Sequence, residues 1–575
     1  MASSASTTPG VSPAATAGRD GTRPPREPRP PLALLVLAVL TARVAVLVWL
    51  LPYDLVADEA HYWEWSRRPA LSYYSKGPGV AWAIGASTAA FGDHEWSVRL
   101  PAAVFAALAM VGLAGLGAAC AGGDRRVGLA AAAAYALAPG YQAVALLATI
   151  DGPLLAFWIL SAWAAWRVVR RLEAGGSALG PSLAFAAALG AGFLCKYTIL
   201  LLLPGVLVFG FVRRRHVRWT PARAAELLAA LPAFLLLASP VIIWNAQVGS
   251  PTVRHLLGAV GLPGGDIPQH GGERWAYDPL WTLSLVGAQL GILGPPLAAL
   301  IGLALWRSLR SRRRRRADPA SAADLFLILC AAPILIFYLG MTVLHKAQGN
   351  WPMAAFATLL VLAARHLVAA RTVPNGPTAP AGEASTSAPE ASPPPSDPRT
   401  PPSHRAFRIA WRWTVGFGLA TGLGVLALPL VARLPLVGHL VPMHRLTGHR
   451  QMAQQLSEDA ADLSRTTGRT PFIIADHYGR ASLLAFYLPG RPRVYCAAAY
   501  LGQRQSQYDY FPDTRLTDPA LVGRPTLLVG SRPDRWTGAF VFDRVQRLPN
   551  QRPASRPNAW PDAFAGLNYQ GVRSP

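Results

Sequence analysis

Long apolar stretches dominate this sequence and limit what it can fold into. A membrane-spanning helix needs about 20 predominantly apolar residues. Stretches of roughly this length lie at 32–51, 97–119, 152–169, 224–244, 279–306, 323–344, 351–370 and 407–431. Shorter apolar stretches lie at 127–141, 182–195 and 198–212. With 52% hydrophobic and 15% charged residues, the pattern predicts a polytopic α-helical membrane protein of about eleven spans.

Arginine clusters predict how these spans are oriented. Loops rich in Lys and Arg stay on the cytoplasmic side of a membrane. Such clusters occur before the first predicted span and then after every second one, at 23–29, 125–126, 167–171, 213–215 and 312–316. We therefore expect a cytoplasmic N-terminus and an extracytoplasmic C-terminal region in the cytoplasmic (inner) membrane. The net charge of +24 then reflects topology, and a nucleic-acid partner is not predicted.

Changes in composition divide the chain into five segments. Residues 1–31 and 372–404 are rich in Pro, Ser, Thr and Ala, which is typical of disordered segments. We predict a disordered cytoplasmic N-terminus at 1–31, a transmembrane catalytic bundle at 32–371 with an outer loop at 52–96, and a cytoplasmic linker at 372–404. A last transmembrane helix at 405–431 precedes residues 432–575. Helix-like runs at 449–464 and 481–487, and strand-like runs at 471–476, 493–496, 526–529 and 540–542, predict a small extracytoplasmic α/β domain there.

Only three of the 54 cationic Lys and Arg residues are lysines, namely Lys76, Lys196 and Lys346. Arginine replaces lysine wherever a positive charge merely faces water or lipid headgroups, but not where a compact ammonium group must fit a tight site. Any one of the three has an ordinary explanation, since an arginine-biased composition leaves a few lysines by chance. All three fall in predicted outer loops, however, and this shared side favours a functional role.

The same outer side receives several other ionisable residues. Asp58 and Glu59 follow the first span, Asp151 begins the fourth, and His345 precedes the third lysine. Ionisable groups at a membrane boundary are costly to desolvate and often mark sites. Adjacent carboxylates repel, so one can be held near neutrality and exchange protons with an acceptor group. An ordinary helix N-terminus, where Asp and Glu are favoured, explains the pair equally well, and both interpretations stay open.

Several short motifs occur in a characteristic order. They are Asp58-Glu59-Ala60 with Tyr62, Tyr74-Ser-Lys76-Gly-Pro78, Glu95-Trp-Ser-Val-Arg99-Leu-Pro101, Thr149-Ile-Asp151-Gly-Pro153, Lys196-Tyr197, Trp244-Asn245, Lys346-Ala-Gln-Gly-Asn350-Trp-Pro352, Asp476-His-Tyr478 and Phe486-Tyr-Leu-Pro-Gly490. The set resembles polyprenyl-phosphate-sugar-dependent glycosyltransferases. These include the protein O-mannosyltransferases of glycosyltransferase family 39 and the bacterial transferase that adds aminoarabinose to lipid A.

The resemblance implies an inverting glycosyltransferase of the C-type fold, with a sugar on a polyprenyl monophosphate as donor. By analogy, Asp58 is the general base or orients the acceptor, Glu59 supports it, and Asp151 orients the acceptor or pairs with a lysine. Lys76 matches the position that grips the donor phosphate, although Gly77 here separates it from Pro78. The further candidates are Arg99, Lys196 and Lys346 for the donor phosphate, and Tyr62, Tyr74, His345 and Asn350 for the substrates.

Cofactors and alternative functions stay open at this stage. No cofactor is predicted, but a divalent cation between Asp58 and Glu59 is an open possibility. The predicted acceptor is lipid A, another glycolipid or an envelope glycan, with protein, as in O-mannosyltransferases, as the alternative. A lipid-linked-sugar flippase or other transporter predicts charges through the depth of the bundle and internal repeats, whereas this sequence collects its charges at the outer side. A catalytically silent relative is expected to lack the acid or the lysine of the first loop, and both are present.

Overall fold

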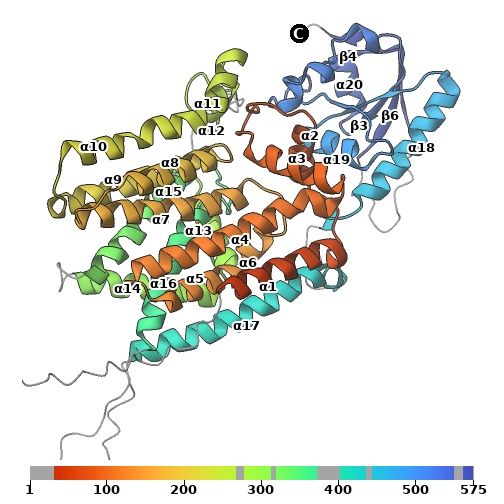
Figure 1. Ribbon diagram of the computed structural model, residues 1–575. Helices are drawn as coiled ribbons and strands as arrows, with labels where there is room; N and C mark the ends of the chain where they lie inside the picture. Colours follow the sequence, from red (N-terminus) through yellow and green to blue (C-terminus); the bar gives the residue numbers. More distant parts are fainter. Residues whose placement is uncertain are drawn as a thin grey trace, which may run out of the picture.

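The computed structural model describes residues 32–266, 277–312, 319–371, 402–434, 443–549 and 561–573. The predicted N-terminal segment 1–31 and residues 372–401 of the predicted linker lie outside the described residues. Figure 1 shows a bundle of long helices and, at one end of it, a smaller region of strands and helices formed by residues 443–573. We call this smaller region the C-terminal region.

Seven helical segments are long and apolar enough to cross a membrane. They are Leu32–Leu50 (α1, Leu32–Ala45, with a short helical extension), Glu95–Cys120 (α4), Asp151–Glu173 (α7), Tyr197–His216 (containing α9, Leu202–Arg213), Pro221–Val248 (α10, Pro221–Leu228, and α11, Ala230–Val248), Ser321–Leu344 (within α15, Pro319–Leu344) and Arg405–Val431 (within α17, Pro402–Val431). A bent pair, α13 (Pro279–Leu293) and α14 (Pro295–Arg312), makes an eighth candidate if it crosses as one span.

The described part of the chain is thus a polytopic helical membrane protein with seven or eight candidate spans. The predicted total of about eleven exceeds this number because three predicted spans fall on shorter helices. These are α5 (Arg125–Leu137), α8 (Leu179–Phe193) and α16 (Met353–Ala369). α16 is almost entirely buried, so it is enclosed by other helices.

Local sequence signals explain where several helices begin and bend. The Asp124 side chain accepts a hydrogen bond from the Arg126 N–H at the start of α5, and the Asp278 side chain caps α13 in the same way. Between α13 and α14 the chain turns by 104° at Gly294, whose φ of +77° is a conformation that glycine adopts readily. Pro295 then begins α14 with its ring at a position that needs no N–H donor. The bend therefore follows from the sequence.

Small residues allow the central helices to approach closely. α4 packs against both α5 and α7. A side chain at Gly128 of α5 would place its Cβ 2.2 Å from the carbonyl oxygen of Ala114 in α4. In membrane helix pairs, where burial of apolar surface gives little driving force, such close backbone contact is a main source of stability. The bundle core contains many alanines in addition to Leu, Ile and aromatic residues.

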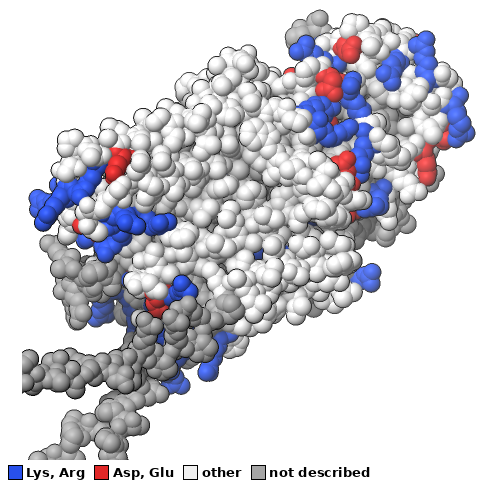
Figure 2. Space-filling view, viewed as in Figure 1, with Lys and Arg blue, Asp and Glu red and all other residues white. Residues whose placement is uncertain are grey.

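Charged side chains gather at the two ends of the molecule. Figure 2 shows blue and red atoms at the far end of the bundle and over the C-terminal region, with a broad white surface between them. Exposed apolar side chains of α1, α11 and α17 belong to this uncharged zone, among them Leu37, Leu236 and Leu423. An uncharged zone between two charged ends is what a bilayer requires of a protein that spans it.

The predicted outer loop and the C-terminal region share one hydrophobic core. The loop forms α2 (Ala57–Ser66) and α3 (Gly79–Phe91), and α2 packs against α19 (Tyr478–Tyr487). The shared core includes Trp63, Tyr73 and Ile84 from the loop and Leu484, Phe486, Leu456, Ile473 and Phe511 from the C-terminal region. The two parts therefore form a single packed layer at one end of the bundle (Figure 1).

A five-stranded mixed sheet organises the C-terminal region. Its strands follow the order β2-β1-β3-β6-β5, and their bounds are Val494–Cys496, Phe472–Ala475, Thr526–Val529, Ala563–Leu567 and Arg544–Arg547. β1 is parallel to β2 and β3, whereas β6 is antiparallel to β3 and β5. Alternate residues of β1 enter different cores: Ile473 joins the core shared with the outer loop, and Ile474 joins a second core on the other face.

The remaining elements complete the two faces of this sheet. α18 (His449–Thr467) and α19 pack against each other on the side of the outer loop. The second core includes Trp536 of α20 (Pro533–Ala539) and Phe540 of a small ladder, in which β4 (Phe540–Val541) pairs with β7 (Gly571–Val572). The helices and strands predicted at 449–464, 471–476, 481–487, 493–496, 526–529 and 540–542 correspond to α18, β1, α19, β2, β3 and β4. β5, β6 and α20 were not predicted.

A buried ion pair fastens the outer loop to the bundle. The Arg99 Nη2 of α4 lies 2.7 Å from the Glu59 Oε2 of α2, and both side chains are almost fully buried. Arg99 also donates hydrogen bonds to the carbonyl oxygens of Tyr53 and Asp54, at 2.9 and 2.7 Å. Glu59 accepts two more, from the backbone N–H groups of Val56 and Ala148, at 3.0 and 2.8 Å. This one pair therefore joins the end of the first span, α2, α4 and the segment before α7.

We expect replacement of Arg99 by methionine to lower the free energy of unfolding by about 3–5 kcal/mol, because Glu59 is left buried without its countercharge. Unfolding of the protein in detergent micelles, by heat and by denaturant, measures this loss. Arg170→Met is the matched control, since Arg170 pairs with Glu173 at the surface and such pairs contribute about 0–1 kcal/mol. Equal stability of the two variants would contradict the structural role of the buried pair.

Candidate functional site

Asp58 and Glu59 are neighbours in sequence but face different surroundings. Both lie in the first turn of α2. Glu59 is fully buried against Arg99, whereas the Asp58 side chain is open to solvent. The Arg99 guanidinium is engaged with Glu59 and with two backbone carbonyls, and its predicted role in binding the donor phosphate stays a prediction. The ion pair between Glu59 and Arg99 holds the turn of α2 that also carries Asp58.

The C-terminal region places two side chains beside Asp58. The Tyr478 hydroxyl lies 3.5 Å from the Asp58 Oδ1, and the Arg504 Nη2 lies 3.3 Å from the Tyr478 oxygen. The Arg504 guanidinium also lies over the Tyr478 ring, 5.4 Å from its centroid. Although Asp58 is exposed on one side, the surrounding protein partly desolvates its carboxylate and raises its pKa, while Arg504, Tyr478 and Lys76 oppose this rise. A carboxylate with a raised pKa, open to solvent, is suited to accept a proton.

Close backbone packing sets the position of Lys76. The Gly79 N–H donates to the carbonyl oxygen of Leu194 at 2.9 Å. A Cβ at Gly77 would lie only 2.2 Å from the same oxygen. The glycine that separates Lys76 from Pro78 thus lets this loop lie directly against the segment that carries Lys196. In the described part of the chain, the ammonium group of Lys76 forms neither an ion pair nor a hydrogen bond.

Burial, together with the nearby charges of Lys196 and Arg504, lowers the pKa of Lys76 to about 8. Asp151 and Asp58 act against this shift. Lys76 is thus half-buried, without a direct countercharge and electrostatically linked to both carboxylates. Such a cation is poised to bind an anion that the protein itself does not supply.

Asp151 lies between two of the other predicted residues. The Lys196 Nζ lies 2.6 Å from the Asp151 Oδ1, and the Asn350 Nδ2 donates to the Asp151 Oδ2 at 2.7 Å. Asp151 and Lys196 are both buried, so each offsets the cost of burying the other. Of the two predicted alternatives for Asp151, the structure shows the pairing with a lysine. Three segments that are distant in sequence therefore meet at this carboxylate.

We call the following six residues the Asp58 cluster: Asp58, Lys76, Asp151, Lys196, Tyr478 and Arg504. Interactions among their charges and hydroxyl groups join all six. They come from α2, the loop after it, the start of α7, the segment before α9, and the C-terminal region. With two carboxylates and three cationic side chains, the cluster carries an excess of one positive charge when all of them are ionised.

The other predicted substrate-binding residues are placed in different ways. Tyr62 is buried close to the cluster, and this burial, followed by the charges of Asp58 and Asp151, raises the pKa of its hydroxyl. Tyr74 donates its hydroxyl hydrogen to Asp266 at 2.6 Å and stacks on Tyr510. Its hydroxyl is therefore engaged in joining the outer loop to the segment after α12 (Pro251–Ala259).

His345 and Lys346 are not brought into the cluster by any contact among the described residues. The His345 Nε2 lies 2.9 Å from the carbonyl oxygen of Ala259 at the end of α12. Lys346 is exposed, and its ammonium group makes neither a hydrogen bond nor an ion pair within the described ranges. The predicted donor contact of Lys346 stays a prediction, whereas His345 has a visible role in holding α12.

Arg504 was not predicted as a site residue, and Tyr478 entered the prediction only within a motif. Arg504 lies between two glutamines in a polar stretch, and no pattern in that stretch separates it from 50 other arginines. Its electrostatic contacts reach Asp58, His61, Lys76 and His255. Only the packing of the C-terminal region onto α2 brings it to the site, and sequence offers no signal for that packing.

A buried histidine network fixes this packing. His61 of α2 accepts a hydrogen bond from Trp65 Nε1 at 3.1 Å, and its Nδ1 lies 2.9 Å from the Ser482 oxygen of α19. Because the indole N–H is only a donor, the hydrogen of a neutral His61 resides on Nδ1. Burial lowers the pKa of His61 to about 3, so the imidazole stays neutral. Gly479 completes the contact, since a Cβ there would lie 2.7 Å from that of Ala57.

The surroundings of Glu59 do not fit a divalent cation between Asp58 and Glu59. Both Glu59 oxygens accept hydrogen bonds from Arg99, and each accepts one more from a backbone N–H. A cation at this position would lie next to the Arg99 guanidinium. Within the ranges that the structure describes, no group of three His, Cys, Asp or Glu side chains is arranged to hold a metal ion.

Comparisons with known proteins agree with this fold and with the class of protein that the sequence motifs indicated. Residues 75–244 match the family model described as dolichyl-phosphate-mannose-protein mannosyltransferase. Over 316 residues, or 54% of the chain, the sequence is 26% identical to the lipid A galacturonosyltransferase RgtD of Rhizobium johnstonii. This match spans only 60% of the length of that relative.

The fold is similar to that of ArnT from Cupriavidus metallidurans. The apo crystal structure matches with a TM-score of 0.56 and 16% identity, over 93% of this chain and 97% of ArnT. The structure of ArnT bound to undecaprenyl phosphate matches over the same shares, with a TM-score of 0.53 and 15% identity. These comparisons confirm the resemblance to family-39-like, polyprenyl-phosphate-sugar-dependent glycosyltransferases that the sequence motifs indicated.

Because the chain has only three lysines, the protonation of Lys76 can be measured directly. We expect the ¹³C signal of dimethylated Lys76 to titrate with a midpoint near pH 8, because the ammonium form is present below its lowered pKa of about 8 and lost above it. NMR of the reductively ¹³C-methylated protein in micelles records this, with Lys76→Arg assigning the signal and Lys346 as the exposed reference. A Lys76 midpoint above pH 10 would show that its ammonium is not desolvated.

Proposed function

We propose that the protein is an integral membrane glycosyltransferase that moves a sugar from a polyprenyl monophosphate to an envelope glycolipid. The observation that carries the proposal is the half-buried ammonium of Lys76, which has no direct countercharge in the described part of the chain and lies in one cluster with the open carboxylate of Asp58. A cation without a partner suits a phosphate, and a carboxylate with a raised pKa suits an acceptor hydroxyl or amine. The family match and the ArnT-like fold support the same reaction class.

The proposed reaction is a displacement at the anomeric carbon of the donor. The Asp58 carboxylate takes the proton of the acceptor group, whose oxygen or nitrogen forms a bond to the anomeric carbon. The bond from that carbon to the phosphate oxygen breaks, and its electron pair leaves with the polyprenyl phosphate. Lys76 and Arg504 stabilise the second negative charge that develops on this phosphate. Attack from the face opposite the leaving group inverts the anomeric configuration.

Asp151, Lys196 and Asn350 act as positioning residues in this mechanism. Lys196 is neutralised by its ion pair, at 2.6 Å, with Asp151, so its charge is largely unavailable to the donor. Its remaining effect is on Lys76, whose pKa it lowers. We assign buried Tyr62 to substrate binding, as the resemblance of its motif implies, and its electrostatic linkage to Asp58, Tyr478 and Asp151 supports a place beside the cluster.

The proposed membrane arrangement follows the arginine clusters. We place the Asp58 cluster at the extracytoplasmic face, with about eleven crossings when the shorter helices α5, α8 and α16 are counted as spans. The charged end of the bundle opposite the C-terminal region (Figure 2) then faces the cytoplasm. Among acceptors, the match to a lipid A galacturonosyltransferase favours a lipid A-type glycolipid over a protein.

We expect Asp58→Asn to reduce transfer by about 10²–10⁴-fold, the usual contribution of a general base. Lys76→Ala and Arg504→Ala are expected to cost about 10²–10³-fold each through lost stabilisation of the leaving phosphate. The measurement is transfer of radiolabelled sugar from a panel of undecaprenyl-phosphate sugars to envelope glycolipid by the purified protein.

Arg532→Ala is the control, since Arg532 is exposed in the C-terminal region and pairs with Asp534 at the surface. Folding of every variant is checked by its thermal unfolding in the same detergent. Full activity of Asp58→Asn or Lys76→Ala would contradict the site, and a wild type that moves lipid-linked sugar across vesicle membranes without transferring it would favour a flippase.

A further inference from the structure

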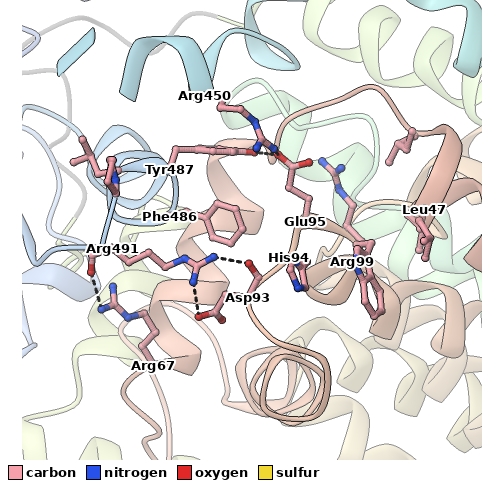
Figure 3. Close-up of a pocket in the computed structure, with 16 residues that line it drawn as sticks. Leu47, Arg67, Asp93, His94, Glu95, Arg99, Arg450, Phe486, Tyr487 and Arg491 are labelled. Atoms are coloured by element: carbon pink, nitrogen blue, oxygen red, sulfur yellow. Dashed lines mark hydrogen bonds and ion pairs between the residues drawn. The ribbon is translucent and has the colours of Figure 1, made fainter. Parts of the chain in front are cut away.

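A second site lies apart from the Asp58 cluster. A cavity of about 750 Å³ opens between the outer end of the first span, the start of α4 and residues 486–491 of the C-terminal region (Figure 3). None of the six residues of the cluster lines it. Its volume falls in the range of about 300–1,000 Å³ typical of sites for small ligands. The proposed transfer reaction does not use this cavity.

One wall of the cavity is apolar and lies at the membrane boundary. Leu47, Val48 and Leu51 at the outer end of the first span form this wall, with Trp96 of α4 nearby in the lining. The neighbouring Trp49 and Leu50 of the same helix are strongly exposed, as expected for side chains that face lipid. A ligand in the cavity can therefore keep an acyl chain in the bilayer while its headgroup lies inside the protein.

Guanidinium groups gather on the other side of the cavity. Arg450, Arg67 and Arg491 all line it. Arg450 is largely exposed and donates one hydrogen bond, at 3.0 Å, to the Glu95 carboxylate, which leaves most of its five donors for a ligand. Arg491 has a left-handed backbone with φ of +48°, a conformation that costs a non-glycine residue free energy. Its guanidinium is directed to Asp93 and over the Phe486 ring (Figure 3).

Two carboxylates and several aromatic rings distinguish the cavity from a simple anion site. The Glu95 Oε1 accepts hydrogen bonds from the Tyr487 hydroxyl, at 2.6 Å, and from Arg450. Its Oε2 accepts none from the residues that the structure describes. Carboxylates repel an anion but accept hydrogen bonds from hydroxyl groups, while guanidinium groups bind phosphate or carboxylate. The combination suits a headgroup that carries both sugar hydroxyls and an anionic group.

We propose that this cavity binds the anionic, sugar-bearing headgroup of an envelope glycolipid. The identification of this lipid as the acceptor rests on the proposed function, but its binding does not. Arg99 lines the cavity and pairs with Glu59, whose neighbour in α2 is Asp58. The Glu59–Arg99 pair therefore connects the wall of this cavity with the turn of helix that carries the proposed base.

The test measures binding rather than transfer. The full-length protein in phosphatidylcholine nanodiscs is titrated with three probes, namely an acylated, diphosphorylated glucosamine disaccharide, the same disaccharide without phosphates, and phosphatidylglycerol. Arg450→Gln is compared with Arg465→Gln, an exposed arginine of the same helix that pairs with Asp462 and does not line the cavity. Native mass spectrometry counts the bound lipids and gives each dissociation constant.

The phosphorylated disaccharide is expected to bind to the wild type and to Arg465→Gln with equal affinity. Its affinity for Arg450→Gln should fall roughly 10- to 100-fold, the range for losing hydrogen bonds to a charged group. The other two probes should bind at least tenfold more weakly to the wild type. Unchanged affinity in Arg450→Gln, or equal binding of phosphatidylglycerol, would overturn the proposal.

Binding and sugar transfer, measured on the same preparations, distinguish this inference from the proposed function. If the wild type binds the phosphorylated disaccharide through Arg450 but transfers no sugar to any acceptor, the binding site stands and the proposed reaction fails. If sugar is transferred normally while Arg450→Gln binds the disaccharide as tightly as the wild type, the reaction stands and the cavity is not the glycolipid site.

Discussion

One buried ion pair, Glu59 with Arg99, fixes the arrangement at the end of the bundle that carries the C-terminal region. Removing two charges from water is costly, and the cost is offset here by two-pronged contact and by hydrogen bonds to four backbone groups. As a result, the end of the first span, α2 and α4 are held in one relative position. This arrangement also fixes the position of Asp58, since Asp58 directly precedes Glu59 in the same helical turn.

The second constraint is the contact between α2 and α19. A neutral His61 between Trp65 and Ser482, and a glycine at position 479, allow the two helices to pack closely. This contact brings Tyr478 and Arg504 to Asp58. The cluster is therefore complete only when the C-terminal region is packed against α2. Within the cluster, Lys196 is neutralised by Asp151, and Lys76 and Arg504 are the cations that the proposed function assigns to the donor phosphate. The three cations of the cluster are similar in type, but their partners differ, and the partners decide which of them can bind an anion.

Sequence alone predicted much of this fold, because its strongest signals are physical. Apolar stretches as long as a bilayer is thick located the membrane helices, and short strand-like runs located β1, β2, β3 and β4 of the C-terminal region. The span count was less certain, since a helix such as α16 is short and enclosed by other helices, so its length alone does not decide whether it crosses. β5 and β6 lack a strong pattern, and β5 is a largely exposed edge strand with two arginines.

For the site, sequence identified residue types but not their partners. The scarcity of lysine singled out Lys76 and Lys196, and the carboxylates at the membrane boundary singled out Asp58 and Asp151. The sequence did not reveal that Arg99 forms an ion pair with Glu59, because the two residues are distant in sequence and each also fits a substrate-binding role. It did not reveal Arg504 either, since one arginine among many carries no distinguishing pattern until the fold places it beside Tyr478.

The most direct test of the central claim is a structure of the protein with an undecaprenyl-phosphate sugar bound, determined by cryo-electron microscopy in nanodiscs. We predict the donor phosphate within hydrogen-bonding distance of the Lys76 ammonium and the Arg504 guanidinium, with the anomeric carbon facing Asp58. A phosphate bound away from Lys76, for example against Arg450 in the cavity beside the first span, would contradict the assignment of the Asp58 cluster as the reaction site.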